Sequence, residues 1–133
     1  MTHPVLDPAD LHDPTPFGYR HTTRVPSGKE LVFVAGQYAS SPDGRVVSAE
    51  FAAQVRQALD NLGRALAAHE LTFADVVQLR TYVVGLDFAK LGVIGDAVTG
   101  RWGTRPPTNT LLGVAALAMP EMLFEIEAVA ARP

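Results

Sequence analysis

Apolar and polar residues alternate along most of the chain, and the period of this alternation predicts where helices and strands lie. The longest helical pattern covers residues 48–71, where apolar side chains recur at the spacing of an amphipathic helix. Ser48 is the expected N-cap, because a serine hydroxyl accepts a backbone N–H at a helix start. Gln54 falls outside the apolar stripe. The stripe comprises Phe51, Val55, Ala58, Leu59, Leu62, Ala65 and Leu66.

Five segments have the composition and alternation of β-strands. They are residues 18–25, 31–39, 76–85, 105–117 and 122–131. The first two flank a Pro-Ser-Gly turn and predict a hairpin. In the third, Leu79, Thr81 and Val83 alternate with polar neighbours. A second helix is expected over residues 87–102 with Asp87 as its cap, although three internal glycines weaken this pattern.

These elements follow one another in the order β-β-α-β-α-β-β, which predicts an α+β fold with two helices on one face of a mixed sheet. Residues 1–16 are rich in proline and aspartate and predict an irregular N-terminal arm, and residues 17–133 form one domain. We expect the other face of the sheet to be covered by self-association. Its expected apolar residues are Leu112, Val114, Phe124 and Ile126.

Composition narrows the class of protein further. Apolar residues make up 47% of the chain and charged residues 19%, which is typical of a globular domain, and a net charge of −3 weighs against nucleic-acid binding. No apolar run is long enough for a membrane helix, and no basic segment precedes an apolar one as in a secretion signal. There is no cysteine. We therefore expect a cytoplasmic protein.

The scattered histidines give no metal-binding motif, so neither a metal nor a cofactor is expected. His21 is expected to be a surface residue of a strand rather than a catalyst. Tyr19 is open to two interpretations, a core aromatic residue or the wall of a pocket.

The segment FEIEAVA offers the most informative carboxylates. Positions two apart in a strand share a face, so Glu125 and Glu127 project together and Phe124 and Ile126 project the other way. A solvated face of the sheet explains this pattern, and so does a site. In a site, apolar surroundings would raise a carboxyl pKa toward the range that suits acid–base catalysis.

Five segments taken together resemble the Rid/YjgF family over residues 18–130. They are GYRHTTRV, LVFVAGQ, FAAQVRQALDNLGRAL, DVVQLRTYVVGLDFA and RPPTNTLLGVAALAMPEMLFEIEAVA. The resemblance implies a chorismate-mutase-like fold assembled as a homotrimer, with ligand clefts between subunits. It also implies hydrolysis of 2-imino or 2-enamino acids without a cofactor or metal. In the family, an arginine after the proline binds the substrate carboxylate, and a glutamate in the last strand moves protons with a water.

The resemblance transfers to this chain residue by residue and is incomplete. Glu125 falls on the catalytic glutamate and Asn109 on the arginine, whose loss removes a charge-assisted pair worth roughly several kcal/mol of substrate binding. Arg105 either replaces that arginine or is an ordinary surface residue. Ala35 stands where the family has serine, and Gly92 where it has asparagine. The implied substrate-binding residues are Tyr19, Ala35, Gly36, Gly92, Arg105, Asn109 and Thr110.

Two functions stay open at this point. The first is a RidA-like homotrimer that binds a small metabolite in intersubunit clefts and hydrolyses an imine or enamine with Glu125 as acid–base group. The second is a non-catalytic trimer that binds a small molecule or a protein for regulation. The acidic balance weighs against an RNA-cleaving role.

Overall fold

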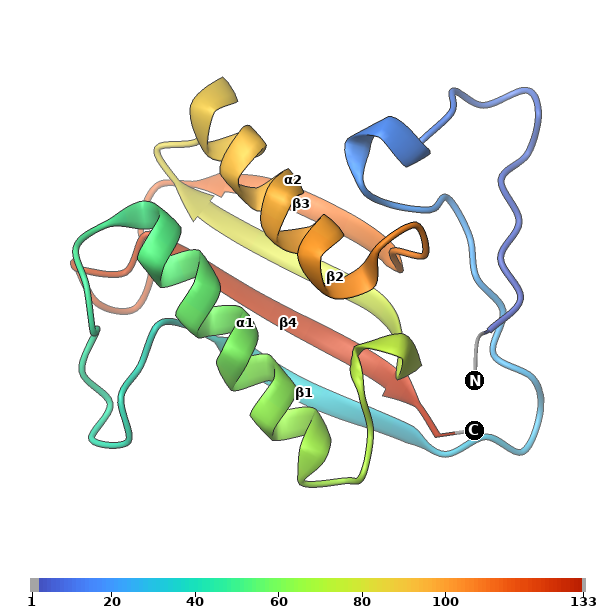
Figure 1. The fold of residues 1–133 in the computed structure, drawn as a ribbon, viewed down its shortest axis with the longest axis horizontal. Helices are drawn as coiled ribbons and strands as arrows, with labels where there is room; N and C mark the ends of the chain where they lie inside the picture. The colour runs from blue at the N-terminus through green and yellow to red at the C-terminus, as the bar shows by residue number, and fades with distance from the viewer. Residues whose placement is uncertain (1–2, 133) are drawn as a thin grey trace.

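Four strands form one mixed sheet in the order β1-β4-β2-β3 (Figure 1). They are β1 (Leu31–Gln37), β2 (Val76–Val84), β3 (Thr108–Val114) and β4 (Phe124–Ala131). β4 pairs antiparallel with both β1 and β2, whereas β2 and β3 run parallel. The computed structural model describes residues 3–132, so residues 1, 2 and 133 of the predicted arm and domain lie outside the described residues.

Helices α1 (Phe51–Ala67) and α2 (Phe88–Trp102) lie on the same face of the sheet (Figure 1). α1 packs on β4 and β1, and α2 connects the parallel strands β2 and β3. Two short 3-10 helices, Thr15–Phe17 and Phe73–Asp75, complete the elements of the described residues. The α+β class is therefore confirmed. No helix within residues 3–132 combines the length and apolarity needed to cross a bilayer.

The core lies between the helices and the sheet and follows the predicted stripe. Val55, Leu59 and Leu62 are buried, and the Phe51 ring meets Phe124 edge to face at 6.1 Å between centroids. Asp87 caps α2 as expected, because its Oδ1 accepts the N–H of Lys90 at 2.8 Å. The alternation predicted for β2 is also confirmed, with its helix-facing side chains buried and its other face open.

Gln54 is a correction to the predicted stripe, because it is fully buried. Its amide N–H₂ group donates to the carbonyls of Ser48 at 2.8 Å and Glu121 at 2.9 Å. Its Oε1 accepts the N–H of Leu123 at 2.9 Å. These three hydrogen bonds join the start of α1 to the chain that leads into β4, and they satisfy the buried amide.

The predicted bounds of the first helix were too wide. α1 begins at Phe51, and the Ser48 hydroxyl accepts the N–H of Glu50 before the helix rather than capping it. The helix ends at Ala67, and Glu70 then adopts a left-handed backbone with φ of 60°, which a helix cannot include.

The strand predicted over residues 18–25 does not form, and neither does its hairpin with β1. Its polar groups bind the N-terminal segment instead: the Thr23 hydroxyl and the Arg24 N–H both donate to the Pro4 carbonyl. Thr23 forms an isolated bridge with Val5. Figure 1 shows this segment at one end of the sheet rather than within it. The boundary between an arm over 1–16 and a domain over 17–133 stays a prediction.

Two further expectations about the last strands need correction. β3 starts only at Thr108, because the two preceding prolines have no N–H to donate to a strand pair. Phe124 and Ile126 face the helices and are 1% exposed, so they do not lie on the uncovered face. The uncovered face instead exposes Phe33 and Leu112.

The Gln54 network predicts the effect of replacing Gln54 with leucine, which has a similar volume. Gln54→Leu leaves three main-chain groups without a partner, so we expect a loss of about 3 kcal/mol or more in the free energy of unfolding. Urea unfolding at fixed protein concentration measures it. Gln57→Leu is the control on the same helix, because the Gln57 amide donates to the Asn61 side chain one turn away. Equal losses in the two variants would contradict this account.

Candidate functional site

β4 separates carboxylates from apolar side chains, as the alternation predicted. Its side chains are alternately buried and partly exposed, with Glu125 and Glu127 on the partly exposed side. Glu125 lies opposite Tyr82 in the register with β2. Both carboxylates therefore project from the face that the helices leave uncovered, close to the phenol of Tyr82.

Gly36 lies directly under the Glu125 carboxyl group. The β1–β4 register shifts between Val34 and Gln37, which is a bulge or irregularity that includes Gly36. A Cβ built on Gly36 would meet Glu125 Oε2 and lie 2.8 Å from its Cδ. The missing side chain of Gly36 therefore makes room for the carboxyl group, as glycine often does where another group closely approaches the backbone.

The surroundings of Glu125 make its carboxyl group bind a proton more tightly than an ordinary glutamate does. Burial raises the pKa of Glu125, and the negative charge of Glu127 raises it further. The Tyr82 hydroxyl donates a hydrogen bond to Glu127 Oε1, and this bond is the main reason why the pKa of Tyr82 is raised. Of the two carboxyl groups, Glu125 therefore has a raised pKa, and Glu127 is held by a hydrogen bond from the Tyr82 phenol.

A pocket of about 480 Å³ lies between residues 19–25 and the sheet. It brings together Tyr19, Asn109 and Thr110, three of the residues expected to bind substrate. The Tyr19 hydroxyl lies 2.5 Å from His12 Nε2. Tyr19 is thus part of a pocket wall, one of the two interpretations left open above, and its hydroxyl already has a partner.

Asn109 points away from the face that holds Glu125. Its Oδ1 accepts a hydrogen bond from the Thr81 hydroxyl at 3.1 Å, and Thr81 is fully buried on the helix side. Two strand spacings and three residue positions separate Asn109 from Glu125, so their Cα atoms are about 14 Å apart in one chain. Thr110 lies on the opposite face from Asn109 and is exposed.

The remaining expected site residues lie elsewhere. Ala35 is exposed on β1 next to Gly36. Gly92 lies on the exposed surface of α2, with no atom near the position of a Cβ. Arg105 lines a different cavity, beside Trp102. One chain therefore gathers the expected residues in two places, Gly36 with Glu125 and the pocket with Tyr19, Asn109 and Thr110.

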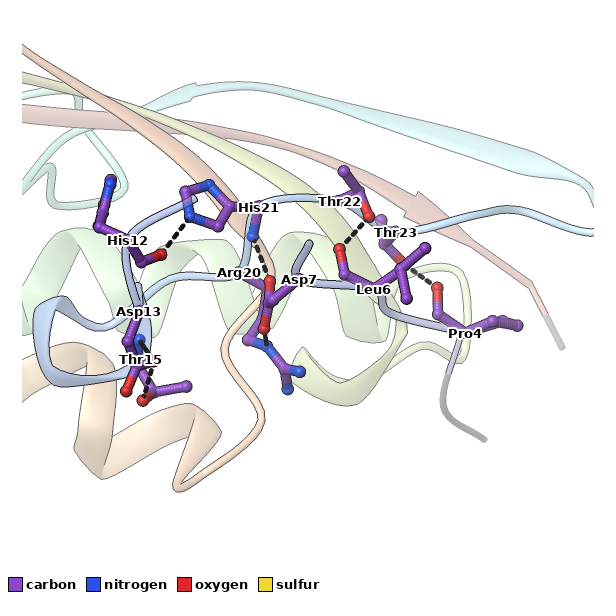
Figure 2. Close-up of polar contacts among 10 residues, drawn as sticks. All are labelled: Pro4, Leu6, Asp7, His12, Asp13, Thr15, Arg20, His21, Thr22 and Thr23. Atoms are coloured by element: carbon purple, nitrogen blue, oxygen red, sulfur yellow. Dashed lines mark hydrogen bonds and ion pairs between the residues drawn. The ribbon is translucent and has the colours of Figure 1, made fainter. Parts of the chain in front are cut away.

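Arg20 is a cationic residue that the sequence patterns did not single out. Its backbone N–H donates to the Pro107 carbonyl at 3.2 Å, and its Nε lies 2.6 Å from Asp7 Oδ2. Figure 2 shows Asp7 between Arg20 and the backbone N–H of His21. Burial would raise the pKa of Asp7, but these hydrogen bonds hold it below its usual value. The sequence indicated that Arg20 lies near the pocket only through its position directly after Tyr19.

Within residues 3–132, no group of three or more histidine, cysteine, aspartate or glutamate side chains is arranged to hold a metal ion.

Comparisons with known proteins agree on one family. The sequence model described as Endoribonuclease L-PSP matches residues 17–132. The 2-iminobutanoate/2-iminopropanoate deaminase of Escherichia coli is 32% identical over 103 residues, which cover 77% of this chain and 80% of the deaminase. Among solved structures, YyfB of Yersinia pestis, described as a Rid family protein of unknown function, matches with a TM-score of 0.91 and 39% identity over 99% of this chain and 100% of YyfB. TdcF of E. coli with bound serine matches with a TM-score of 0.67 and 27% identity, over 82% of this chain and 85% of TdcF.

The contact between Gly36 and Glu125 predicts the effect of a methyl group at Gly36. In Gly36→Ala the new Cβ displaces the flexible Glu125 carboxyl group toward solvent, so we expect the pKa of Glu125 to fall toward its ordinary value. A carboxyl-carbon NMR titration measures that pKa. Gly92→Ala is the matched control, because its Cβ meets open space. An unchanged pKa of Glu125 in Gly36→Ala would show that the carboxyl group is not held against Gly36.

The Glu125–Glu127 pair predicts a shift in the pH dependence of stability. Because the folded state raises the pKa of Glu125, its contribution to stability is full below its unfolded pKa and is lost as pH rises through its folded pKa. Glu127→Gln removes one of the two causes and keeps an acceptor for Tyr82, so this loss becomes smaller and ends at lower pH. Urea unfolding across the acidic range measures the change. Glu121→Gln, at an exposed position, is the control, and the same pH profile in both variants would contradict the coupling.

Proposed function

The chain belongs to the Rid/YjgF family, whose sequence model is described as Endoribonuclease L-PSP, and on this premise we propose that it is a cytoplasmic homotrimer that hydrolyses a small imine or enamine. The ligand lies in clefts between subunits, and Glu125 is the acid–base group. No cofactor or metal takes part in this proposal.

The position of Glu125 is the observation that supports this function. Its carboxyl group is half-buried against Gly36, beside a second carboxylate, and its pKa is raised by burial and by that neighbour. A carboxyl group with a raised pKa exchanges protons with substrate more readily near neutral pH than an ordinary glutamate. A merely solvated face of the sheet would not require a glycine under the carboxyl group.

The proposed reaction is balanced by one water. Glu125 takes a proton from a water whose oxygen adds to the imine carbon, and the carbon–nitrogen double bond becomes a single bond. Glu125 then returns the proton to the nitrogen, which gives a carbinolamine. The hydroxyl proton of the carbinolamine next passes through Glu125 to the nitrogen as the carbon–nitrogen bond breaks, so ammonia leaves and the carbonyl forms. The redox state of the substrate carbon does not change, so neither an oxidant nor a reductant is needed.

Assembly into a trimer would complete the cleft. One chain holds Gly36 with Glu125 in one place and Tyr19 with Thr110 in another. In the proposed trimer, the first group of one subunit faces the second group of the neighbouring subunit, and the cleft lies between them. We propose that the ligand forms hydrogen bonds with Tyr19, with Asn109 and with the backbone at Gly36 and Thr110. Ala35, Gly92 and Arg105 are proposed to line the cleft rim. The exposure of Phe33 (73%) and Leu112 (47%) on the uncovered sheet face supports self-association.

A second candidate function is ligand binding without catalysis, with the same trimer acting as a regulatory protein. The side chain of Asn109 favours it, because its oxygen accepts a hydrogen bond from Thr81 and its amide has no charge to bind a substrate carboxylate. We do not extend the ribonuclease description of the family to this chain, because its net charge of −3 would repel RNA.

The deaminase assay separates the two candidates. When 2-iminobutanoate is generated in solution, we expect the wild-type protein to accelerate its loss and Glu125→Gln to lower that acceleration about 100-fold or more, because the proton acceptor is removed. Following the absorbance of the imine measures both rates. Glu121→Gln is the control, since Glu121 lies before β4 and is exposed.

The outcomes of this assay are distinct. No acceleration by wild type together with a gain in Asn109→Arg would reject hydrolysis of 2-imino acids and support binding without catalysis. Acceleration that Glu125→Gln fully retains would reject Glu125 as the acid–base group. A monomer in a sizing experiment would reject the intersubunit cleft.

A further inference from the structure

A second cavity, of about 590 Å³, lies at the end of the sheet where β2 and β3 begin. Its walls come from the N-terminal segment, the start of β2, the end of α2 and the prolines before β3. β4 contributes no residue to it, so Glu125 lies outside this cavity. The cavity is therefore separate from the Glu125 carboxyl group, although Arg20, Thr23 and Val77 line both this cavity and the 480 Å³ pocket and Arg105 is also proposed for the cleft rim.

The charged lining of this cavity is cationic. Arg20, Arg101 and Arg105 line it, and no aspartate or glutamate does. Arg20 is paired with Asp7, and Arg101 Nη2 lies 2.9 Å from Asp60 Oδ1. The Arg105 guanidinium has no such partner among residues 3–132. One positive charge at the cavity is thus left to be balanced.

The base of the Arg105 side chain is held in place. Its backbone N–H donates to the Trp102 carbonyl at 3.0 Å, and two buried prolines follow it. Proline fixes the φ angle of the chain, so Arg105 starts from a stiff segment at the cavity wall. The free guanidinium can therefore meet a ligand with little cost from ordering the backbone.

His3 supplies an independent sign of an absent partner. Its side chain lines the same cavity and is 8% exposed, and neither ring nitrogen has a hydrogen-bond partner in the described structure. Buried polar groups are almost always paired, so an unpaired buried imidazole calls for a partner within the cavity. Hydrogen bonds from Thr23 and Arg24 to the adjacent Pro4 carbonyl, of which Figure 2 draws the first, hold the chain that carries His3.

Apart from Thr23 and Thr104, the rest of the lining is apolar. Trp102 is 7% exposed, and its Nε1 donates to the Phe73 carbonyl at 2.7 Å. With its N–H already used, the indole offers carbon surface to the cavity. Val76, Val77 and Pro106 extend this surface. An occupant that matches these walls has an apolar body.

We propose that this cavity binds a small monocarboxylate with an apolar body. The carboxylate pairs with the guanidinium of Arg105 and accepts a hydrogen bond from His3, and the apolar body packs on Trp102. A single negative charge matches the single unbalanced arginine, and a planar carboxylate matches the fork of a guanidinium. The proposal does not depend on hydrolysis at Glu125.

Trp102 makes the proposal directly testable, because it is the one tryptophan of the sequence. Titration with sodium benzoate, against sodium chloride at equal ionic strength, is expected to change the Trp102 fluorescence in a saturable way. Benzamide, which has the same shape without the charge, is expected to bind at least about tenfold more weakly. Arg105→Gln and His3→Phe are each expected to weaken benzoate binding about tenfold, because each removes a hydrogen-bond donor to the carboxylate.

Two further variants serve as controls. Arg45→Gln removes an exposed arginine outside the cavity and should leave the titration unchanged. Glu125→Gln, which would abolish the proposed hydrolysis, should also leave it unchanged, so the two proposals fail separately. Urea unfolding confirms that each variant is folded.

Three results would overturn the proposal. They are an absence of saturable change in the wild-type protein, equal affinity for benzamide and benzoate, and unchanged benzoate affinity in Arg105→Gln. The last variant is decisive, because the Arg105 side chain is exposed and its replacement breaks no ion pair with residues 3–132.

Discussion

The buried amide of Gln54 joins α1 to the chain that leads into β4, and the geometry of the sheet follows from that join. Its hydrogen bonds to Glu121 and Leu123 hold the residues just before Phe124, the first residue of β4. A slip of one residue in β4 would move every side chain to the other face. The apolar side chains of this strand would then face solvent, and Glu125 would face the core. An amide in the first turn of α1 thus helps to keep the Glu125 carboxyl group on the correct face of the sheet.

Strand β4 contributes apolar side chains to the core on one face and carries the two carboxylates on the other. Phe124 and Ile126 are buried under the helices, while Glu125 and Glu127 project from the other face. Because β4 pairs with both β1 and β2, Glu125 has Gly36 on one side and Tyr82 on the other. The raised pKa of Glu125 arises from this position, through burial first and through the charge of Glu127 second. The alternation of side chains along β4 therefore determines both the packing of the core and the raised pKa of Glu125.

Periodicity predicted the elements well and their long-range partners poorly. The stripe of α1, the alternation of β2 and the shared face of Glu125 and Glu127 are local properties, so the sequence was sufficient for them. Gln54 was placed outside the core because its partners lie 67 and 69 residues away in the chain. The segment 18–25 has strand-like alternation, but alternation does not say which backbone will pair with it. For the same reason, alternation in β4 predicted two faces without saying which one the helices cover.

The arginine side chains of this chain do not lie where the family resemblance predicts a carboxylate-binding arginine. At Asn109, where the family resemblance predicts a carboxylate-binding arginine, the side chain is neutral and accepts a hydrogen bond from the buried Thr81. Arg105, which forms no ion pair with residues 3–132, lies instead at the end of the sheet, and Arg20, which lines the same cavity, is paired with Asp7. The arginine without an ion pair therefore lies in a cavity to which β4 contributes no residue, whereas Glu125 lies beside a second carboxylate. Under the two proposals, proton transfer and anion binding, which a single arginine-containing cleft would combine, fall on different surfaces of one small fold.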